Sequence, residues 1–204
     1  MRTTSSSAGW ASAPCSWHPS LEPADLKAQV RENLEHLGLD ILDVVNLRLS
    51  AEGTGEESIA EQFGVLAELR KEGPIRHLGL SAASDVQLAE AQAIAPVVTV
   101  QNLYNFTRRD DAAMVDRCAA ETIAYAAFFP LGGITPLESA TLSNVAERLG
   151  ASPQQVALAW LLQRSVTMVL IPGTSSVDHL RENVAAANLV LPPGALAELD
   201  TIGR

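Results

Sequence analysis

Apolar residues recur along this chain at two spacings, which alternate from one end of the sequence to the other. In one kind of segment they return every three or four residues, as in an α-helix with one buried face. In the other kind they form short β-branched runs, which are typical of buried strands. The helical spacing predicts helices over 26–37, 59–69, 84–94, 110–120, 152–162, from the end of the last strand through 187, and 192–199. The apolar runs predict strands over 41–47, 75–81, 97–102, 123–129 and 166–171.

Two of the predicted helix starts carry a reciprocal capping signal. Ser84 stands three positions before Gln87, and Ser152 stands three positions before Gln155. Each serine can accept from a backbone N–H while the glutamine side chain reaches back to the serine N–H, which is a capping box. Pro153 suits the first turn of the second helix. We therefore expect helices to begin at these two places.

Strands that alternate with helices, without hairpin turns between them, predict βαβ units and a parallel sheet. We predict one α/β domain over 21–204, preceded by a poorly ordered, Ser- and Ala-rich lead-in over 1–20. Doubly wound and barrel architectures both fit the pattern, although no Gly-x-Gly-x-x-Gly fingerprint follows the first predicted strand. In both architectures ligands bind at the carboxyl ends of the strands.

Composition and charge narrow the range of partners. The 204 residues carry a formal net charge of -10. Such a surface repels nucleic acid and anionic membranes, so we predict neither as a partner. The 2 cysteines are too few for a disulfide framework, which favours a cytoplasmic protein. No apolar run reaches the length of a membrane span.

The ends of the predicted strands carry polar side chains with little charge. They are Asn46, Arg48, Ser81, Gln101, Asn102, the run 128–133 and the run 173–176. This set holds no pair of carboxylates, no His/Cys cluster with metal spacing and no nucleophile beside a base, so we predict neither hydrolysis nor a metal site. Its hydroxyls, amides and aromatic face suit an elongated ligand with phosphates and a flat ring.

The stretch 171–183 (IPGTSSVDHLREN) passes from a predicted strand into a predicted helix. Gly173 allows the backbone to approach a ligand closely. The first N–H groups of the helix have no intrahelical acceptor and favour an anion, and Thr174 and Ser175 add hydroxyl donors. The sequence supports equally well a purely structural interpretation, in which Ser175 or Ser176 caps the helix.

Several runs resemble the aldo/keto reductases, and they occur in family order from about residue 21 to the end. They are 78–81 (LGLS), 100–105 (VQNLYN), 129–132 (FPLG), 157–160 (ALAW) and 171–175 (IPGTS). The runs 42–48 (LDVVNLR) and 171–183 are similar to one branch of that family, the bacterial pyridoxal reductases. The resemblance implies a (β/α)8 barrel of the aldo/keto reductase type, incomplete, with about five of eight strands present.

The family binds NADPH and reduces an aldehyde or ketone to an alcohol by hydride transfer, so the resemblance implies a small carbonyl substrate, with pyridoxal as a candidate. It implies that Ser81 and Gln101 hold the nicotinamide carboxamide, while Phe128 stacks on the nicotinamide ring. The implied residues for the rest of the cofactor are Leu131 and Gly132 at the pyrophosphate, Gly173, Thr174, Ser175 and His179 at the 2′-phosphate, and Glu182 and Asn183 at adenine.

The chain departs from the family pattern at several positions. Arg48 stands at a catalytic position that usually holds histidine, where it can orient a substrate oxygen but stays charged. An ion pair with a neighbouring carboxylate explains Arg48 equally well. Ala82 stands where asparagine is usual and removes a donor to the carboxamide. The catalytic aspartate, tyrosine and lysine belong to an N-terminal third that we interpret as lacking, since neither Tyr104 nor Tyr125 matches the tyrosine motif.

Alternative functions therefore stay open. The chain is interpreted either as an NADPH-dependent carbonyl reductase, whose remaining third is encoded upstream or on a second polypeptide, or as an inactive remnant that binds a nicotinamide nucleotide or a partner protein. An unrelated barrel enzyme that acts on a phosphorylated metabolite is a further alternative. Barrel strands that do not close leave unpaired edges, so self-association is also predicted. The substrate, and a preference for NADPH over NADH, do not follow from the sequence.

Overall fold

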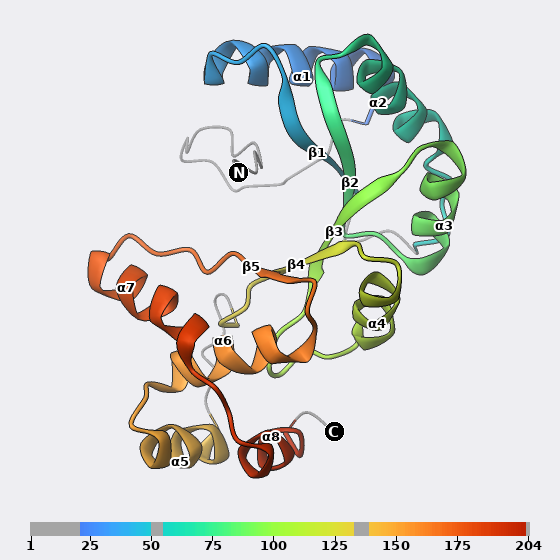
Figure 1. Cartoon of the computed structure of the whole chain (residues 1–204). Coiled ribbons are helices and arrows are strands. Elements are labelled where there is room, and N and C mark those ends of the chain that lie inside the picture. The colour runs from blue at the N-terminus through green and yellow to red at the C-terminus, as the bar shows by residue number, and fades with distance from the viewer. Residues whose placement is uncertain (1–20, 50–54, 133–138, 203–204) are drawn as a thin grey trace, which may run out of the picture. The chain divides into compact units, whose positions relative to one another are not determined.

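The computed structural model describes residues 21–49, 55–132 and 139–202, so the predicted lead-in over 1–20 lies outside the described residues. The chain divides into two compact units, Met1–Gln101 and Asn102–Arg204, and each is described by itself (Figure 1). In the described residues no helix combines the length and the apolar character needed to cross a membrane.

The first unit alternates helices with parallel strands. Its elements are α1 (Pro23–Leu37), β1 (Leu42–Arg48), α2 (Ala60–Glu72), β2 (Ile75–Ser81), α3 (Asp85–Ile94) and β3 (Val97–Leu103). β1 pairs with β2, and β2 pairs with β3, both in parallel. The predicted alternation of strand and helix is thereby confirmed over this part of the chain.

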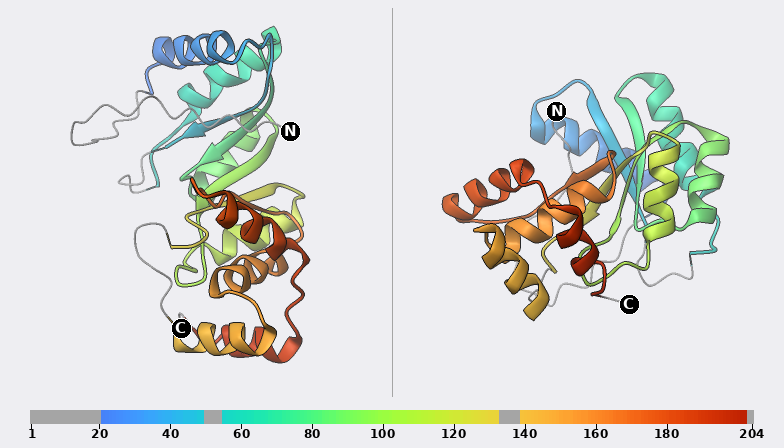
Figure 2. Two further views of the ribbon diagram at one scale, coloured as in Figure 1. Left: turned by 90° about the vertical axis from the view of Figure 1, so that its left-hand side faces the viewer. Right: turned by 60° about the horizontal axis from the view of Figure 1, so that its bottom comes forward.

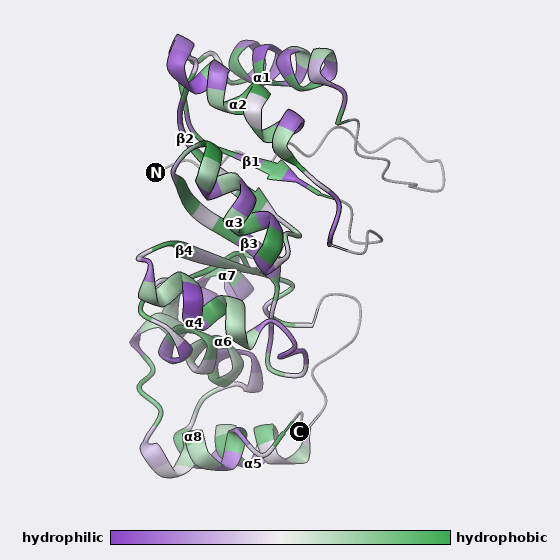
Figure 3. Ribbon diagram, turned by 90° about the vertical axis from the view of Figure 1, so that its right-hand side faces the viewer, coloured by the Kyte–Doolittle hydropathy of each residue, from purple (hydrophilic) through white to green (hydrophobic). Residues whose placement is uncertain are grey.

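The strands of the first unit have two different faces. Leu78 and Leu80 of β2 and Val100 of β3 are fully buried, together with Phe63 of α2 and Leu88 of α3. These side chains form the apolar core between the strands and the helices. Hydrophilic and hydrophobic residues are interspersed along α1, as expected for a helix with one buried face (Figure 3). The opposite face of the strands carries the polar residues considered below.

The second unit contains shorter strands and more helices. Its elements are α4 (Ala112–Ala120), β4 (Ala124–Phe128), α5 (Ala140–Leu149), α6 (Pro153–Arg164), β5 (Met168–Leu170), α7 (Val177–Ala185), the 3-10 turn η1 (Ala186–Asn188) and α8 (Pro193–Leu199). β4 and β5 pair in parallel. Helices α5 and α8 lie side by side (Figure 2). The Arg148 guanidinium of α5 forms an ion pair with the Glu198 carboxylate of α8.

Aromatic side chains form the centre of the second unit. Tyr104 stacks on Trp160 with ring centroids 6.2 Å apart, and the Arg109 guanidinium lies 4.3 Å from the Trp160 ring centroid. The hydroxyl of Tyr125 donates to Asp111 at 2.6 Å. Burial, together with the neighbouring Asp111 charge, raises the pKa of Tyr125 far above its ordinary value. Both tyrosines of this chain are therefore structural, because Tyr104 is 1% and Tyr125 is 0% exposed.

The predicted helix starts are confirmed at both capping boxes. Ser84 and Gln87 cap α3, and Ser152 and Gln155 cap α6, each with both reciprocal hydrogen bonds. The prediction was incomplete at α5, which lies outside the predicted elements although Ser139 caps it. It was also wrong in the extent of β5, which covers 168–170 rather than 166–171, since Val166 is 99% exposed in a turn.

Glu90 of α3 stabilises the start of α2 and provides a test of this packing. Its carboxylate accepts from the Ile59 N–H at 2.7 Å and from the Ser58 hydroxyl at 2.6 Å. The Ile59 hydrogen bond, followed by that of Ser58, lowers the pKa of Glu90 below its ordinary 4.5. A lowered folded-state pKa means that this stabilisation is present above the unfolded-state pKa and is lost as the pH falls through the folded-state pKa.

We expect Glu90→Gln to lower the free energy of unfolding at pH 7 by about 1 kcal/mol, because charge-assisted hydrogen bonds become neutral ones. The difference from the unsubstituted chain should shrink below about pH 4, where the carboxyl group protonates in the unfolded state. Urea unfolding at both pH values measures it. Glu72→Gln removes an exposed carboxylate near the end of α2 and serves as the control. An equal loss at both pH values would contradict the prediction.

Candidate functional site

The parallel register of the first unit brings three predicted site residues into one row. Arg48 pairs with Ser81, and Ser81 pairs with Gln101, at the carboxyl ends of β1, β2 and β3. Paired residues of neighbouring strands point to the same face of a sheet. Ser81 is only 5% exposed, whereas Arg48 is exposed. The row thus joins a hydroxyl, an amide and a guanidinium at the carboxyl edge of the three strands.

A second row lies one layer deeper on the same face and contains Asn46, Gly79 and Thr99. Asn46 Nδ2 donates to Gln101 Oε1 at 3.4 Å, which links the two rows. Within the described residues, Asn46 Oδ1 is a buried oxygen without a hydrogen-bond partner. A Cβ at position 79 would collide with Asn46 Oδ1 and Thr99 Cγ2, and would lie 2.8 Å from the Thr99 carbonyl oxygen. Glycine is therefore required at 79 to make room for Asn46.

Sequence reasoning marked Asn46 as a polar strand end but assigned it no role. The signal that reveals its role is the glycine opposite it on β2, and that signal becomes visible only when the register of the two strands is known.

Ala82 follows Ser81 in a left-handed backbone conformation, with φ of 58°. Its N–H donates to the Gln101 carbonyl at 3.0 Å, so the conformation is tied to the neighbouring strand. Asparagine enters this region more readily than alanine, because its side chain forms local hydrogen bonds there. The departure from the family pattern at Ala82 therefore has a backbone consequence besides the lost side-chain donor.

The end of β4 places the predicted stacking residue beside a strained neighbour. The Phe128 and Phe129 rings meet edge to face with centroids 5.4 Å apart, and Phe129 has φ of 51°. The Phe129 carbonyl accepts from the Gly132 N–H at 2.9 Å and from Asn105 Nδ2 at 3.0 Å. Asn105 is 2% exposed and holds this turn from inside the second unit. Sequence reasoning missed that contribution of Asn105.

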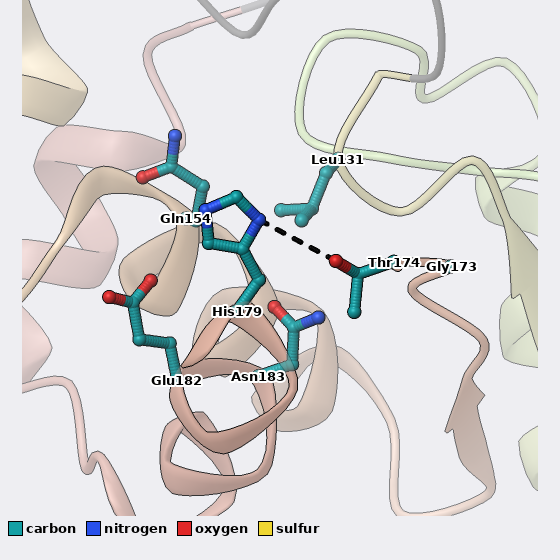
Figure 4. Close-up of a pocket in the computed structure, with 7 residues that line it drawn as sticks. All are labelled: Leu131, Gln154, Gly173, Thr174, His179, Glu182 and Asn183. Atoms are coloured by element: carbon teal, nitrogen blue, oxygen red, sulfur yellow. Dashed lines mark hydrogen bonds between the residues drawn. The ribbon is translucent and has the colours of Figure 1, made fainter. Parts of the chain in front are cut away.

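A pocket of about 190 Å³ in the second unit gathers most of the predicted residues of the phosphoadenosine end (Figure 4). Its lining consists of Leu131, Gln154, Gly173, Thr174, His179, Glu182 and Asn183. Gln154 was not predicted, since an exposed glutamine in the first turn of a helix carries no distinctive signal. Ser175 and Gly132 are adjacent in sequence to lining residues but do not line the pocket themselves.

The start of α7 shapes this pocket. His179, Glu182 and Asn183 share one face of the helix, because residues three and four apart are neighbours on its surface. His179 Nδ1 lies 3.5 Å from Thr174 Oγ1, as the dashed line in Figure 4 shows. The Ser176 hydroxyl accepts from the His179 N–H at 3.4 Å and caps the helix. The capping interpretation is thus confirmed for Ser176. Thr174, two residues earlier, is one of the residues that line the pocket.

The chemistry of this pocket is that of a polar binding site. The first N–H groups of α7 and the Thr174 hydroxyl are donors suited to an anion, while the Asn183 amide and the Glu182 carboxylate suit a base with an amino group. Arg181, by contrast, forms an ion pair with Asp178 at 2.9 Å and does not line the pocket. Among the residues that the structure describes, no cluster of three or more His, Cys, Asp or Glu could hold a metal ion.

Comparison with known sequences gives the class of the protein. The model of the aldo/keto reductase family matches residues 11–204. Pyridoxine 4-dehydrogenase of Escherichia coli (strain K12) is 55% identical over 192 residues, which are 93% of this chain and 67% of that protein. An uncharacterized oxidoreductase of Schizosaccharomyces pombe is 38% identical over 94% of this chain and 62% of its own length. This chain belongs to the aldo/keto reductase family, and the match to the Escherichia coli protein agrees with the predicted pyridoxal reductase branch.

Solved structures confirm the predicted fold class. The thermostable aldo-keto reductase Tm1743, in complex with the inhibitor epalrestat, superposes with a TM-score of 0.79 at 30% identity, over 89% of this chain and 67% of that one. The Klebsiella pneumoniae aldo/keto reductase in complex with NADP and acetate gives 0.77 at 25% identity, over 87% and 64%. The fold is therefore an α/β barrel of this family, of which the described residues contribute five parallel strands. The chain spans only about two thirds of the length of these relatives.

The contact between Asn46 and Gly79 predicts a large difference between two glycines. Gly79→Ala should lower the free energy of unfolding by about 2 kcal/mol or more, because the new methyl group overpacks the polar layer. Gly64→Ala, within α2 and with no atom within 4 Å of its added Cβ, should raise it by about 0.5 to 1 kcal/mol. Urea unfolding measures both variants. Equal effects at the two positions would show that the layer is loosely packed.

The left-handed backbone at position 82 predicts opposite effects of two substitutions. Ala82→Asn should raise the free energy of unfolding by about 0.5 to 1 kcal/mol, since asparagine tolerates positive φ. Ala82→Val should lower it by more than about 1 kcal/mol, because a β-branched side chain is strained in this region. Thermal unfolding of the two variants checks the order, and a stabilising valine would refute the assigned conformation.

Proposed function

We propose that this chain supplies the NADPH-binding part of an oxidoreductase that reduces an aldehyde or ketone to an alcohol, with pyridoxal as the substrate to test first. The observation that carries the proposal is the pocket at the start of α7, which gathers five of the residues predicted to bind the phosphoadenosine end. The proposal is supported by the 55% identity to a protein named for its action on pyridoxine. We also propose that the protein is cytoplasmic and that it self-associates.

The donor set of the pocket fits the 2′-phosphate and adenine of NADPH. Thr174 offers a hydroxyl, Gly173 leaves its backbone accessible, and the start of α7 favours an anion. His179 lines the same pocket, at the position where many family members carry arginine. Glu182 and Asn183 can accept from and donate to an adenine ring. We place the 2′-phosphate near Thr174 and His179 and the adenine near Glu182 and Asn183, with Ser175 as an additional hydroxyl at the rim.

The row of Arg48, Ser81 and Gln101 fits the other end of the cofactor. Ser81 and Gln101 offer a hydroxyl and an amide to the nicotinamide carboxamide, and Phe128 offers a ring for stacking. When bound, NADPH supplies the hydride. Arg48 orients the substrate oxygen through its fork of donors, and Leu131 and Gly132 border the pyrophosphate. None of these residues supplies the proton that an alcohol product requires.

A second candidate function is binding of the nicotinamide nucleotide without turnover by this chain alone. Its support is the state of the two tyrosines, both of which are buried in the core of the second unit. The Tyr125 hydroxyl already donates to Asp111, and burial together with the Asp111 charge raises its pKa, which disfavours release of its proton to a substrate. Turnover of pyridoxal, followed as oxidation of NADPH, separates the two candidates.

We expect the chain to bind 2′,5′-ADP, which carries the phosphoadenosine end of NADPH without the nicotinamide, and to bind NADPH more tightly. Thr174→Val should weaken 2′,5′-ADP binding about tenfold, because one hydrogen bond to a charged group is lost. Isothermal titration calorimetry measures both affinities. Ser143→Ala removes an exposed hydroxyl of α5, outside the pocket, and should leave the affinity unchanged. Failure of the unsubstituted chain to bind 2′,5′-ADP would refute the proposed function.

A further inference from the structure

The side-chain amide of Asn46 lies between Gln101 and Gly79, and its two polar atoms have different surroundings. Its nitrogen donates to Gln101 Oε1 at 3.4 Å, while its oxygen is buried against Gly79 without a hydrogen-bond partner in the described structure. A leucine has nearly the same shape and would fill this space without burying an unpartnered oxygen. The amide is therefore unfavourable for packing, and what it contributes in return is the hydrogen bond to Gln101.

The glycine opposite Asn46 supports the same conclusion. Glycine inside a strand weakens it, because it loses more conformational freedom on folding and offers no side chain to pack. Here a larger residue at position 79 would collide with Asn46 Oδ1. Two features that disfavour stability, the buried oxygen and the strand glycine, thus accompany one hydrogen bond from Asn46 to a predicted cofactor-binding residue.

The hydrogen bond determines which end of the Gln101 amide is available. An amide side chain has an acceptor oxygen and a donor nitrogen, and the Asn46 nitrogen can approach only the oxygen. Gln101 Oε1 is turned to Asn46, so Nε2 is the end left to meet a ligand. We propose that Asn46 is a positioning residue that holds Gln101 in this orientation, so that Gln101 recognises a carbonyl oxygen, that of the nicotinamide carboxamide. This inference rests on the proposed function, because it takes Gln101 as a cofactor contact.

The test compares two nucleotides that share the carbonyl oxygen proposed to meet Gln101 and differ only in the group beside it. The probes are NADP+ and its 3-acetylpyridine analogue, which keeps the carbonyl oxygen but has a methyl group in place of the amide NH2. A donating Gln101 should bind both with dissociation constants within about twofold of each other. In Asn46→Asp the carboxylate accepts from Gln101 Nε2 and turns the oxygen to the ligand. The analogue should then bind about tenfold more weakly than NADP+, since it has no donor for that oxygen.

Two further variants keep the test decisive. Asn46→Leu preserves the packing but frees Gln101 to turn either way, so the ratio of the two dissociation constants should rise about threefold even if Asn46→Asp folds poorly. Thr99→Val alters the same layer without touching the hydrogen bond and should leave the ratio unchanged. A ratio that stays constant in both Asn46 variants, or one already near tenfold in the unsubstituted chain, would overturn the inference. Binding of 2′,5′-ADP by the same samples shows whether the proposed function itself holds.

Discussion

The in-register parallel pairing of β1, β2 and β3 is the constraint on which the candidate site of the first unit depends. In a parallel sheet, residues at matching positions of neighbouring strands point to the same face, and the carboxyl ends of the strands share one edge. Arg48, Ser81 and Gln101 are far apart in the sequence, yet this pairing places them in one row. A shift of one residue would turn all three toward the apolar core, where Leu47, Leu80 and Val100 are buried.

The same constraint explains why a small residue stands at position 79. The deeper row contains two side chains with polar atoms, Asn46 and Thr99, and the strand between them has room only for glycine. The Asn46 amide therefore connects the packing of the deeper row with the orientation of Gln101 in the row above. In a close-packed interior a side chain can adopt only a few discrete orientations, so the orientation of Asn46 restricts that of Gln101.

Positive φ angles occur one residue beyond the ends of two strands, at Ala82 after β2 and at Phe129 after β4. Each is held by hydrogen bonds from its surroundings, Ala82 by the Gln101 carbonyl and Phe129 by Asn105. Such backbone conformations persist only where neighbouring groups over-determine them, and they are common at ligand-binding edges. Their positions beside Ser81 and Phe128 agree with the proposed contacts to the cofactor. The second unit adds a helix start, at α7, where one hydroxyl caps the helix and another is left beside the pocket.

The sequence by itself determined the alternation of strands and helices, the two capping boxes and the family, because these depend on local spacing and on motifs a few residues long. The resemblance to the family also named most of the lining of the α7 pocket, because the run 171–183 carries His179, Glu182 and Asn183 at positions that match the family motif. Only the tertiary structure decided that Ser176, rather than Ser175, caps α7. The place of Gln154 in the pocket, the contact of Asn105 with Phe129 and the role of Asn46 likewise required it, because each brings together residues distant in sequence. Strand register and helix packing create those contacts, and neither can be read from local pattern.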